Sequence, residues 1–560
     1  MNIIARLRAE LNHALIKAVT LASQKMRFPA AGIPDFVLEV PREKEHGDFA
    51  TNLALLLAGA IKMSPRKIAG IIKEELNFEG LPVIKVEVAG PGFINFYLDP
   101  AWALRVIPEI INQGEDYGRV NIGNREKVQV EYVSANPTGL LHMGNARGAA
   151  LGDSIASLLD FADYQVTREF YVNDAGTQIE NLGKSLAARY FQLLGFKAEI
   201  PEEGYHGEDL VATTKNFIAL YQDKYLKESA SVREEALVKY ALDEAIAAIK
   251  KTLAEFGVHY DVWFSEASLY ASGSVKEIIE RLKEKGFIYE HEGALWFKAR
   301  EFGARQDEVL VRNNGAPTYF AADIAYHVNK FQRGFTKIIN IWGADHHGHV
   351  ARLKGALAAL GYSPDAVQVI IMQLVRLYRG GEIVRMSKRT GQYVSLEDLI
   401  EEVGRDAARY FFVMRSADSH LDFDLDLARE QSVKNPVYYI QYAHARICSL
   451  KKVLAEQGRT MPRVSSTDLT LLTQEAELAL ARRLADFPEE VTRAVQNLAP
   501  HQIASYIHEV AGLLHAFYNH HRVITADPAL SNSRVLLVEA TRIVLANALK
   551  LLGLKSPERM

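Results

Sequence analysis

From about residue 122 onward, strand-like and helical segments alternate, and this alternation constrains the fold more than any other feature. The expected strands are 128–133, 166–172, 337–342 and 366–375. Turns containing glycine separate them from helical stretches at 146–159, over most of 175–285, and from 350 onward. Strands that alternate with helices predict a parallel sheet covered by helices on both faces, with ligands bound at the carboxyl ends of the strands.

The two flanking regions have different patterns. Residues 1–115 combine helical spacing with two expected strands, at 83–88 and 93–98, and a helix at 101–112. From residue 432 to 560 only helical patterns occur. We therefore predict a multidomain protein with an N-terminal α+β domain (1–115), an α/β Rossmann-like parallel-sheet catalytic domain with insertions (116–431) and an all-α C-terminal domain (432–560), which fits a length of 560 residues.

Composition excludes several classes of protein. The single cysteine, Cys448, rules out an intrachain disulfide and a multi-cysteine zinc site, and it suits the cytoplasm. The longest apolar run, 53–61, is too short to span a bilayer, so no membrane association is expected. The net charge of the chain is −4, whereas residues 432–560 carry fifteen basic and eleven acidic side chains. This local positive charge is compatible with a surface that binds nucleic acid.

The strongest local motif is the string SANPTGLLHMGNAR at 134–147, where the first strand of the sheet ends and a helix begins. A helix N-terminus offers unpaired N–H groups and a partial positive charge, which suit a phosphate. Gly144 allows a ligand to approach the backbone, and His142 can donate a hydrogen bond to a phosphate oxygen. The alternative is that His142 and Asn145 simply cap the helix.

A second motif, RMSKRTG at 385–391, follows an apolar strand and the pair Gly380-Gly381. Three cations within five positions could close over a triphosphate. The alternative is a solvated basic loop.

These two motifs, in this order, resemble the His-x-Gly-His and Lys-Met-Ser-Lys signatures of class I aminoacyl-tRNA synthetases. The chain is most similar to the bacterial type of arginyl-tRNA synthetase. Further matching strings, in family order, are EHGDFATN (45–52), VAGPGFIN (88–95), YVNDAGTQ (171–178), WGADHHGH (342–349), YIQYAHAR (439–446) and SPERM (556–560). Together they cover nearly the whole chain.

The resemblance implies a reaction and its participants. L-Arginine is activated by ATP, with Mg²⁺, to arginyl-adenylate and is then transferred to the 2′-hydroxyl of the terminal adenosine of tRNA(Arg). It implies a cytoplasmic monomer. The implied catalytic residues are His142, Asn145, Arg385 and Lys388. The implied ATP-binding residues are His142, Gly144, Asn145, His346, Met386, Ser387 and Lys388.

Arginine as a substrate requires a planar set of acceptors for five N–H donors. Tyr319 and Asp323 are four residues apart on an expected helix and therefore share a face. The resemblance assigns this pair, with Glu266, to the guanidinium; for Glu266 the alternative is an exposed acid near a helix start. The residues implied to bind arginine are Ser134, Asn136, His142, Glu266, Tyr319, Asp323 and Asp345. The His/Asp cluster at 345–349 could instead bind zinc, although no metal site is our preferred interpretation.

The helical C-terminal region resembles the family's anticodon-binding domain, and the N-terminal region resembles the added domain that contacts the tRNA elbow. Tyr442 is the best candidate for stacking on a base, and Arg446 for contacting a phosphate. Aromatic residues at helical spacing are more often part of a core, and arginines more often lie on a solvated face.

Two positions depart from the family signatures. Asn145 stands at the usual second histidine, and Arg385 stands at the usual first lysine. We expect activity to survive both changes, and the departures raise the hypothesis of a slower or differently tuned activation step. An Asn145→His variant with an unchanged activation rate would remove that hypothesis.

Three other interpretations remain. One is another class I synthetase, although a cysteinyl enzyme is disfavoured because its zinc site needs more cysteine. The second is a small nucleotidyltransferase, which would lack the terminal domains. The third is a catalytically weak paralogue that binds tRNA.

We predict that Asp323→Ala raises the Michaelis constant for arginine far more than that for ATP, because it removes an acceptor for the guanidinium. Arginine-dependent pyrophosphate exchange, with each substrate varied in turn, measures both constants. Equal effects on the two constants would contradict the assignment.

Overall fold

A five-stranded parallel sheet lies at the centre of the protein, in the order β12-β11-β5-β6-β7. The computed structural model describes residues 2–41, 43–137, 139–384 and 394–560. The strands are β5 (Lys127–Glu131), β6 (Gln165–Val172), β7 (Val262–Ser265), β11 (Lys337–Gly343) and β12 (Val367–Met372). The strand order reverses at β5, so a ligand crevice is expected at the carboxyl ends of β5, β6 and β11. The predicted fold class is confirmed.

The helix that follows β5, α5 (Met143–Phe161), is buried along almost its whole length. It packs against the central sheet on one side and against helices of the C-terminal region on the other. Small residues make this close packing possible. A Cβ on Gly152, for example, would collide with the ring of Tyr132.

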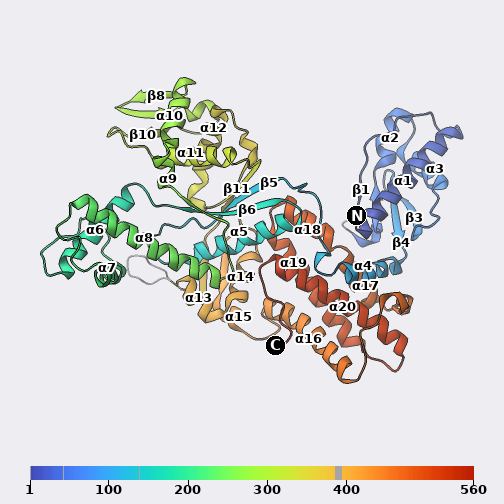
Figure 1. Ribbon diagram of the computed structural model, residues 1–560. Helices are drawn as coiled ribbons and strands as arrows, with labels where there is room; N and C mark the ends of the chain where they lie inside the picture. Colours follow the sequence, from blue (N-terminus) through green and yellow to red (C-terminus); the bar gives the residue numbers. More distant parts are fainter. Residues whose placement is uncertain (1, 42, 138, 385–393) are drawn as a thin grey trace.

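Two insertions extend from the sheet as separate lobes (Figure 1). The first follows β6 and consists of α6 (Thr177–Leu193), α7 (Glu208–Tyr221) and α8 (Ala230–Glu255), which share their own apolar core. The second surrounds an antiparallel sheet and has another core. Its elements are α9 (Ala267–Ala271), α10 (Ser274–Glu284), β8 (Ile288–His291), β9 (Ala294–Phe297) and β10 (Glu308–Val311). Two helices of the central sheet, α11 (Tyr319–Gln332) before β11 and α12 (His347–Leu360) after it, share this core, which includes Ile338 and Val367 of that sheet.

A small sheet, β14-β13-β15, follows β12 and leads to the C-terminal helices. This region contains β13 (Val375–Arg379), β14 (Glu382–Ile383), α13 (Leu396–Val403), α14 (Arg405–Val413), β15 (Leu421–Asp424) and α15 (Leu425–Arg429). The five long helices beyond it are α16 (Pro436–Glu456), α17 (Glu475–Ala485), α18 (Phe487–Gln496), α19 (Pro500–His520) and α20 (Pro528–Leu551).

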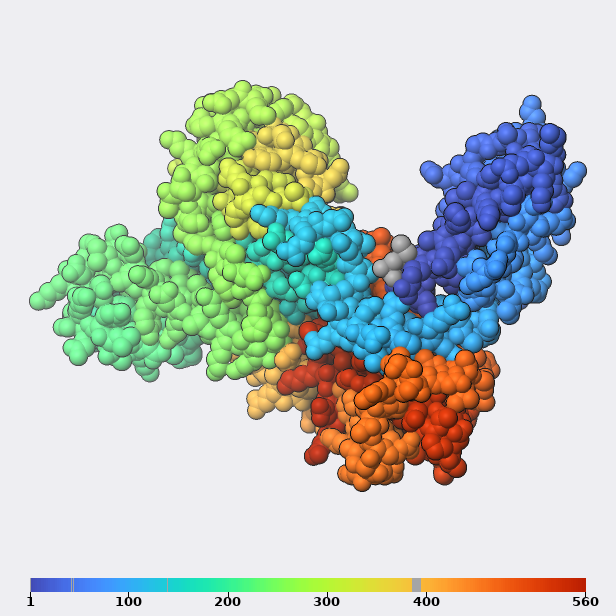
Figure 2. All heavy atoms as spheres, turned by 45° about the vertical axis from the view of Figure 1, so that its right-hand side comes forward, coloured from blue at the N-terminus to red at the C-terminus, as the bar shows by residue number. Residues whose placement is uncertain are grey.

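The N-terminal region stands out from the body of the molecule (Figure 2). Three helices pack on an antiparallel sheet in the order β1-β2-β4-β3. The elements are α1 (Ile3–Gln24), β1 (Leu38–Glu39), β2 (Phe49–Thr51), α2 (Leu53–Ile61), α3 (Pro65–Glu75), β3 (Val83–Ala89) and β4 (Phe93–Leu98). After a 3₁₀ turn, α4 (Val106–Gln113) packs against α17 and α20 and joins this region to the body.

Four sequence-based boundaries were wrong. The expected strand 366–375 is two strands in different sheets, β12 and β13, because the chain leaves the central sheet at Gln373, whose N–H bonds to Ala417. The expected helical stretch 175–285 contains β7, an edge strand of four residues. The first strand ends at Glu131 and not at 133, since Val133 has a positive φ of 70°. The helix expected at 101–112 begins only at Val106, the first residue of α4, because residues 100–105 form a 3₁₀ turn.

A buried arginine joins the catalytic region to the end of the chain. Arg409 on α14 has no exposed surface and donates to Asp153 Oδ2 (2.6 Å) and to the carbonyl oxygen of Leu552 (3.1 Å). Its guanidinium lies against Gly553, where a Cβ would collide with it. In the part of the chain that the structure describes, no helix has both the length and the apolar character needed to cross a membrane.

We predict that Arg409→Ala lowers the free energy of unfolding by about 3–5 kcal/mol, because it removes the buried partner of Asp153 and leaves that carboxylate only the longer ion pair to Arg168, at 3.8 Å. Arg376→Ala is the matched control. It removes an exposed ion pair to Asp422, with an Nε–Oδ1 distance of 2.7 Å, and should cost less than about 1 kcal/mol. Chemical denaturation followed by circular dichroism compares the two variants, and equal losses would contradict this account.

Candidate active site

His142 occupies the N-cap position of α5. Its Nδ1 accepts a hydrogen bond from Gly144 N–H (3.1 Å), and its own N–H donates to Asn145 Oδ1 (3.0 Å). The capping role considered from the sequence is therefore present. A neutral ring that accepts at Nδ1 carries its proton on Nε2, the form that can donate to a phosphate oxygen. Capping and phosphate binding are thus compatible in this geometry.

The loop between β5 and α5 has a constrained backbone. Val133 and Ser134 have φ angles of 70° and 41°, a region that residues other than glycine rarely adopt. Ser134 Oγ donates to Glu131 Oε1 (3.0 Å) and accepts from the Tyr171 N–H (3.1 Å). Asn136 is exposed and donates to Gln178 (3.1 Å). These contacts place both residues at the carboxyl edge of the sheet.

The chain at 395–396 lies beside the first sequence motif. Residues 141–142 pair with 395–396: His142 forms an isolated antiparallel bridge with Ser395, and Leu396 N–H donates to the carbonyl oxygen of Leu141 (2.8 Å). Ser395 also caps α13. The four residues predicted in the second signature, Arg385, Met386, Ser387 and Lys388, lie outside the described residues. The chain that follows them is nonetheless held beside His142.

Glu266 is the most unusual acid of the site. It is 1% exposed, and neither carboxylate oxygen makes a hydrogen bond of normal geometry with a described residue. Burial raises its pKa to about 7, with further increases from Asp323 and Asp174, while the Tyr270 hydroxyl opposes them. The alternative of an exposed acid is therefore wrong. A buried acid without partners is costly, and a cationic ligand would satisfy it.

Asp323 and Tyr319 lie on α11, as the spacing predicted. Asp323 Oδ2 is 2.7 Å from Nε2 of His349 on α12. The Tyr319 side chain is exposed (48%) and lies next to Gly176, in the turn after β6. Together with Glu266, which directly follows β7, these two side chains of α11 present two carboxylates and a hydroxyl around one edge of the sheet.

The segment 345–349 runs from a 3₁₀ turn, which contains Asp345 and His346, into the first turn of α12. Asp345 and His346 are exposed and pair with each other at 3.6 Å. The rings of Trp342, His346 and His349 form a cluster, with the Trp342 centroid 5.8 and 5.5 Å from those of His346 and His349, which are 6.4 Å apart. Among the described residues, only the exposed group Glu43, Glu45 and His46 brings three possible metal ligands together, so the geometry does not support the zinc alternative at 345–349.

Sequence reasoning missed Glu131 and Asp174. Glu131 accepts from Ser134, and Asp174 accepts from Ser265 Oγ (2.6 Å) and Ala267 N–H (2.8 Å), which fixes the chain next to Glu266. For Glu131 a signal was available in the sequence. It is a carboxylate at the end of a parallel strand, and both faces of such a sheet are covered, so a charged side chain there is unusual.

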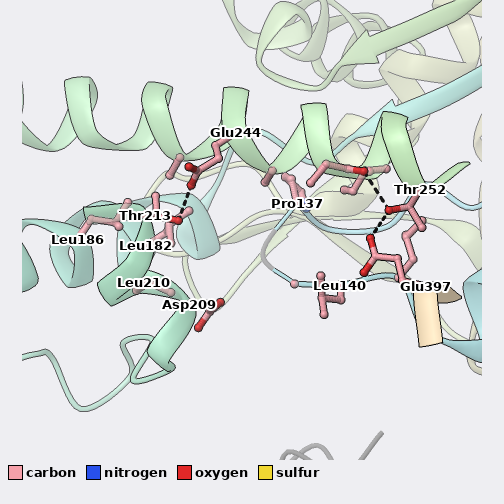
Figure 3. Close-up of a pocket in the computed structure, with 16 residues that line it drawn as sticks. Pro137, Leu140, Leu182, Leu186, Asp209, Leu210, Thr213, Glu244, Thr252 and Glu397 are labelled. Atoms are coloured by element: carbon pink, nitrogen blue, oxygen red, sulfur yellow. Dashed lines mark hydrogen bonds between the residues drawn. The ribbon is translucent and has the colours of Figure 1, made fainter. Parts of the chain in front are cut away.

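A cavity of about 220 Å³ lies close to this edge but is not the candidate site. It is lined by α6, α7, α8, by Glu397 on α13, and by Pro137 and residues 139–141 (Figure 3). No residue predicted from the sequence lines it.

In the helical region, Tyr442 is partly exposed and its ring stacks on Tyr438 and His515, at centroid distances of 6.2 and 5.8 Å. The Arg446 guanidinium covers the ring of Tyr518 (4.2 Å). Tyr442 therefore presents a stacked, accessible face, whereas Arg446 already has an aromatic partner.

Comparison with known proteins agrees with this geometry over the whole chain. Three family models match: "Arginyl tRNA synthetase N terminal domain" at 5–98, "tRNA synthetases class I (R), catalytic domain" at 106–412 and "DALR anticodon binding domain" at 440–560. An arginine–tRNA ligase of Desulforudis audaxviator is 62% identical over 560 residues, which is all of both chains.

The chain belongs to the arginyl-tRNA synthetase family. Among solved structures, one from Campylobacter jejuni described as an arginyl-tRNA synthetase is 33% identical, with a TM-score of 0.75 over 83% of this chain and 100% of that one. The arginyl-tRNA synthetase of Thermus thermophilus has a TM-score of 0.72 at 23% identity, over 98% and 100% of the two chains, and shares the fold. Family membership excludes the small nucleotidyltransferases and the cysteinyl enzymes as alternatives.

Proposed function

We propose that this arginyl-tRNA synthetase family member charges tRNA(Arg) with L-arginine, at the expense of ATP, through arginyl-adenylate. The observation that carries the substrate assignment is Glu266, a buried carboxylate with no cationic partner and no hydrogen bond of normal geometry among the described residues, beside the second carboxylate of Asp323. A guanidinium is planar, permanently charged and rich in donors, and it fits this pair with the Tyr319 hydroxyl.

The α-amino and carboxylate groups of arginine are assigned to Ser134, Asn136 and His142, at the opposite side of the same edge. Asp345 and His346 extend the cleft towards the adenosine. A lysine substrate would leave several of these acceptors unpaired, and discrimination of about 10⁴–10⁵ is accessible by that means. No separate editing site is needed.

In the first reaction, an arginine carboxylate oxygen attacks the α-phosphorus of ATP, the bond to the bridging oxygen breaks, and pyrophosphate leaves. The protein contributes positioning and charge stabilisation. The α5 N-terminus at Gly144, His142 Nε2–H and the cations Arg385 and Lys388 are assigned to the phosphates. In the second reaction, the 2′-hydroxyl of the terminal adenosine attacks the arginyl carbonyl, and AMP leaves.

Asn145 is assigned to the same phosphate-binding end, together with Met386 and Ser387. Mg²⁺ is proposed to enter with ATP, since it binds largely through substrate phosphates and water. Because Glu266 and Asp323, the acids of the site, are assigned to the guanidinium, we assign no protein ligand to Mg²⁺.

The domain roles complete the proposal. Residues 1–115 would contact the tRNA elbow, 116–431 would catalyse both steps, and 432–560 would bind the anticodon loop through the exposed face of Tyr442, with Arg446 at a phosphate. We also propose a cytoplasmic monomer, in keeping with a role in translation.

Pyrophosphate exchange into ATP, run with each of the standard amino acids in the presence and absence of tRNA, tests the proposal. Exchange that depends on arginine alone is expected. Tight binding of tRNA without exchange for any amino acid would instead favour the catalytically weak paralogue.

The raised pKa of Glu266 predicts a pH dependence of arginine binding. Below about pH 7 the unliganded side chain is protonated, and a guanidinium binds its ionised form, so affinity should rise about tenfold per pH unit up to that value and then level off. In the unliganded protein, stability should fall as pH rises from about 4.5 towards 7, since the folded state there binds the extra proton.

Isothermal titration calorimetry of arginine between about pH 5.5 and 8 measures this slope. Glu266→Gln keeps Asp323 and His349 and should weaken arginine about 10–100-fold at pH 8 while removing the slope. A slope that persists in this variant would show that another group titrates.

A further inference from the structure

A row of buried polar residues crosses the central sheet beside the candidate site. Asn340, Glu131 and Glu169 are register partners on the neighbouring strands β11, β5 and β6. All three are at most 6% exposed. Adjacent positions in register point to the same face of a sheet, and here that face receives two cations from α11, Lys330 and Arg333.

Lys330 is the cation at the centre of this row. It has no exposed surface, and its Nζ donates to Glu131 Oε2 (2.6 Å) and Asn340 Oδ1 (2.9 Å). It also lies over the ring of Tyr326, 4.2 Å from the centroid. Burial lowers the pKa of Lys330, while Glu131 and Glu169 oppose that shift and Arg333 adds to it.

One branch of the network leads from Lys330 to Ser134. Glu131 uses one oxygen for Lys330 and the other to accept the Ser134 hydroxyl (3.0 Å). That hydroxyl in turn accepts from Tyr171 N–H, so it is held from two sides. The orientation of the Glu131 carboxylate therefore determines where the Ser134 side chain lies in the loop between β5 and α5.

The other branch leads to Asp323. Asn340 Nδ2 donates to His327 Nε2 (2.8 Å), and His327 Nδ1 donates to the Asp323 carbonyl oxygen (2.8 Å). A carbonyl can only accept, so the proton of His327 is assigned to Nδ1. Burial, and then the charge of Lys330, lower the pKa of His327 well below its ordinary value, which keeps the ring neutral in this tautomer.

We propose that Lys330 is a positioning residue for the amino-acid substrate. Lys330 sets the distance between the Ser134 end and the Asp323 end of the arginine site. The proposal rests on the proposed function, since it presumes that arginine spans these two ends. Lys330 acts through Glu131 on one side and through Asn340 and His327 on the other, and it does not contact the substrate.

A purely structural role is the competing explanation, and the chain contains a matched comparison for it. Arg333 lies three residues further along α11 and pairs with the buried Glu169, with Nη2 2.8 Å from Oε1. Glu169 bonds to Tyr326 and to neither Ser134 nor Asp323. Both pairs fasten α11 to the sheet, but among the described contacts only the Lys330 pair leads to the candidate substrate residues. Buried ion pairs often add little stability over apolar replacements, and specific geometry is a better-supported reason to retain one.

The experiment compares Lys330→Met with Arg333→Met in the full-length protein. Arginine-dependent pyrophosphate exchange with tRNA present gives the Michaelis constants for arginine and ATP, and a thermal melt gives stability. We expect both variants to melt at lower temperature than the unaltered protein. Only Lys330→Met should raise the arginine constant at least tenfold, with the ATP constant within twofold, and Arg333→Met should leave both constants within twofold.

Asn340→Ala provides a second test if Lys330→Met does not fold. It retains the Lys330–Glu131 pair and cuts the branch to His327, so the arginine constant should again rise while the ATP constant stays within twofold. A folded Lys330→Met with an unchanged arginine constant, equal effects in the two methionine variants, or an Asn340→Ala variant with an unchanged arginine constant would each overturn the proposal. Absence of arginine-dependent exchange in the unaltered protein would overturn the proposed function instead.

Discussion

Acidic side chains buried within a parallel sheet must find cations, and this requirement organises the catalytic region. Glu131 and Glu169 lie on adjacent strands and are both buried. One helix, α11, neutralises both by presenting Lys330 and Arg333 about one turn apart. The same helix begins with Tyr319 and carries Asp323. Charge pairing in the core thus determines where the substrate-facing end of α11 lies.

Glu266 is the contrasting case, an acid that the protein does not neutralise with any described residue. Its neighbours Asp323 and Asp174 make ionisation harder, and the unliganded site retains a proton near neutral pH. A binding cation removes that penalty at once, so part of its affinity comes from relief of an unfavourable state that exists before binding. This arrangement favours a permanently charged ligand over one that can lose its proton.

Much of the architecture could be predicted from the sequence because hydrophobic periodicity and glycine turns are local signals. The central strands, the helix that carries Tyr319 and Asp323, and the helical character of the C-terminal region all follow from such patterns. The strand β7 escaped prediction because four residues at a sheet edge give little periodic signal between helices. The partnership of Asn340, Glu131 and Lys330 escaped because it depends on strand register and on contacts across 199 residues of chain. The sequence also left the status of Glu266 open, since burial of one acid is decided by tertiary packing.

Three arginines hold distant parts of the chain together through main-chain oxygens. Arg147 donates to the carbonyls of Gln373 and Ser416, Arg405 to that of Gly553, and Arg409 to that of Leu552. Every amino acid offers the same carbonyl, so these hydrogen bonds place no demand on the side chains at 373, 416 and 552. Gly553 is the exception, because a Cβ there would collide with Arg409. At the other three positions the contact leaves no trace in the identity of the accepting residue, so co-varying residue pairs are a poor guide to physical contact there.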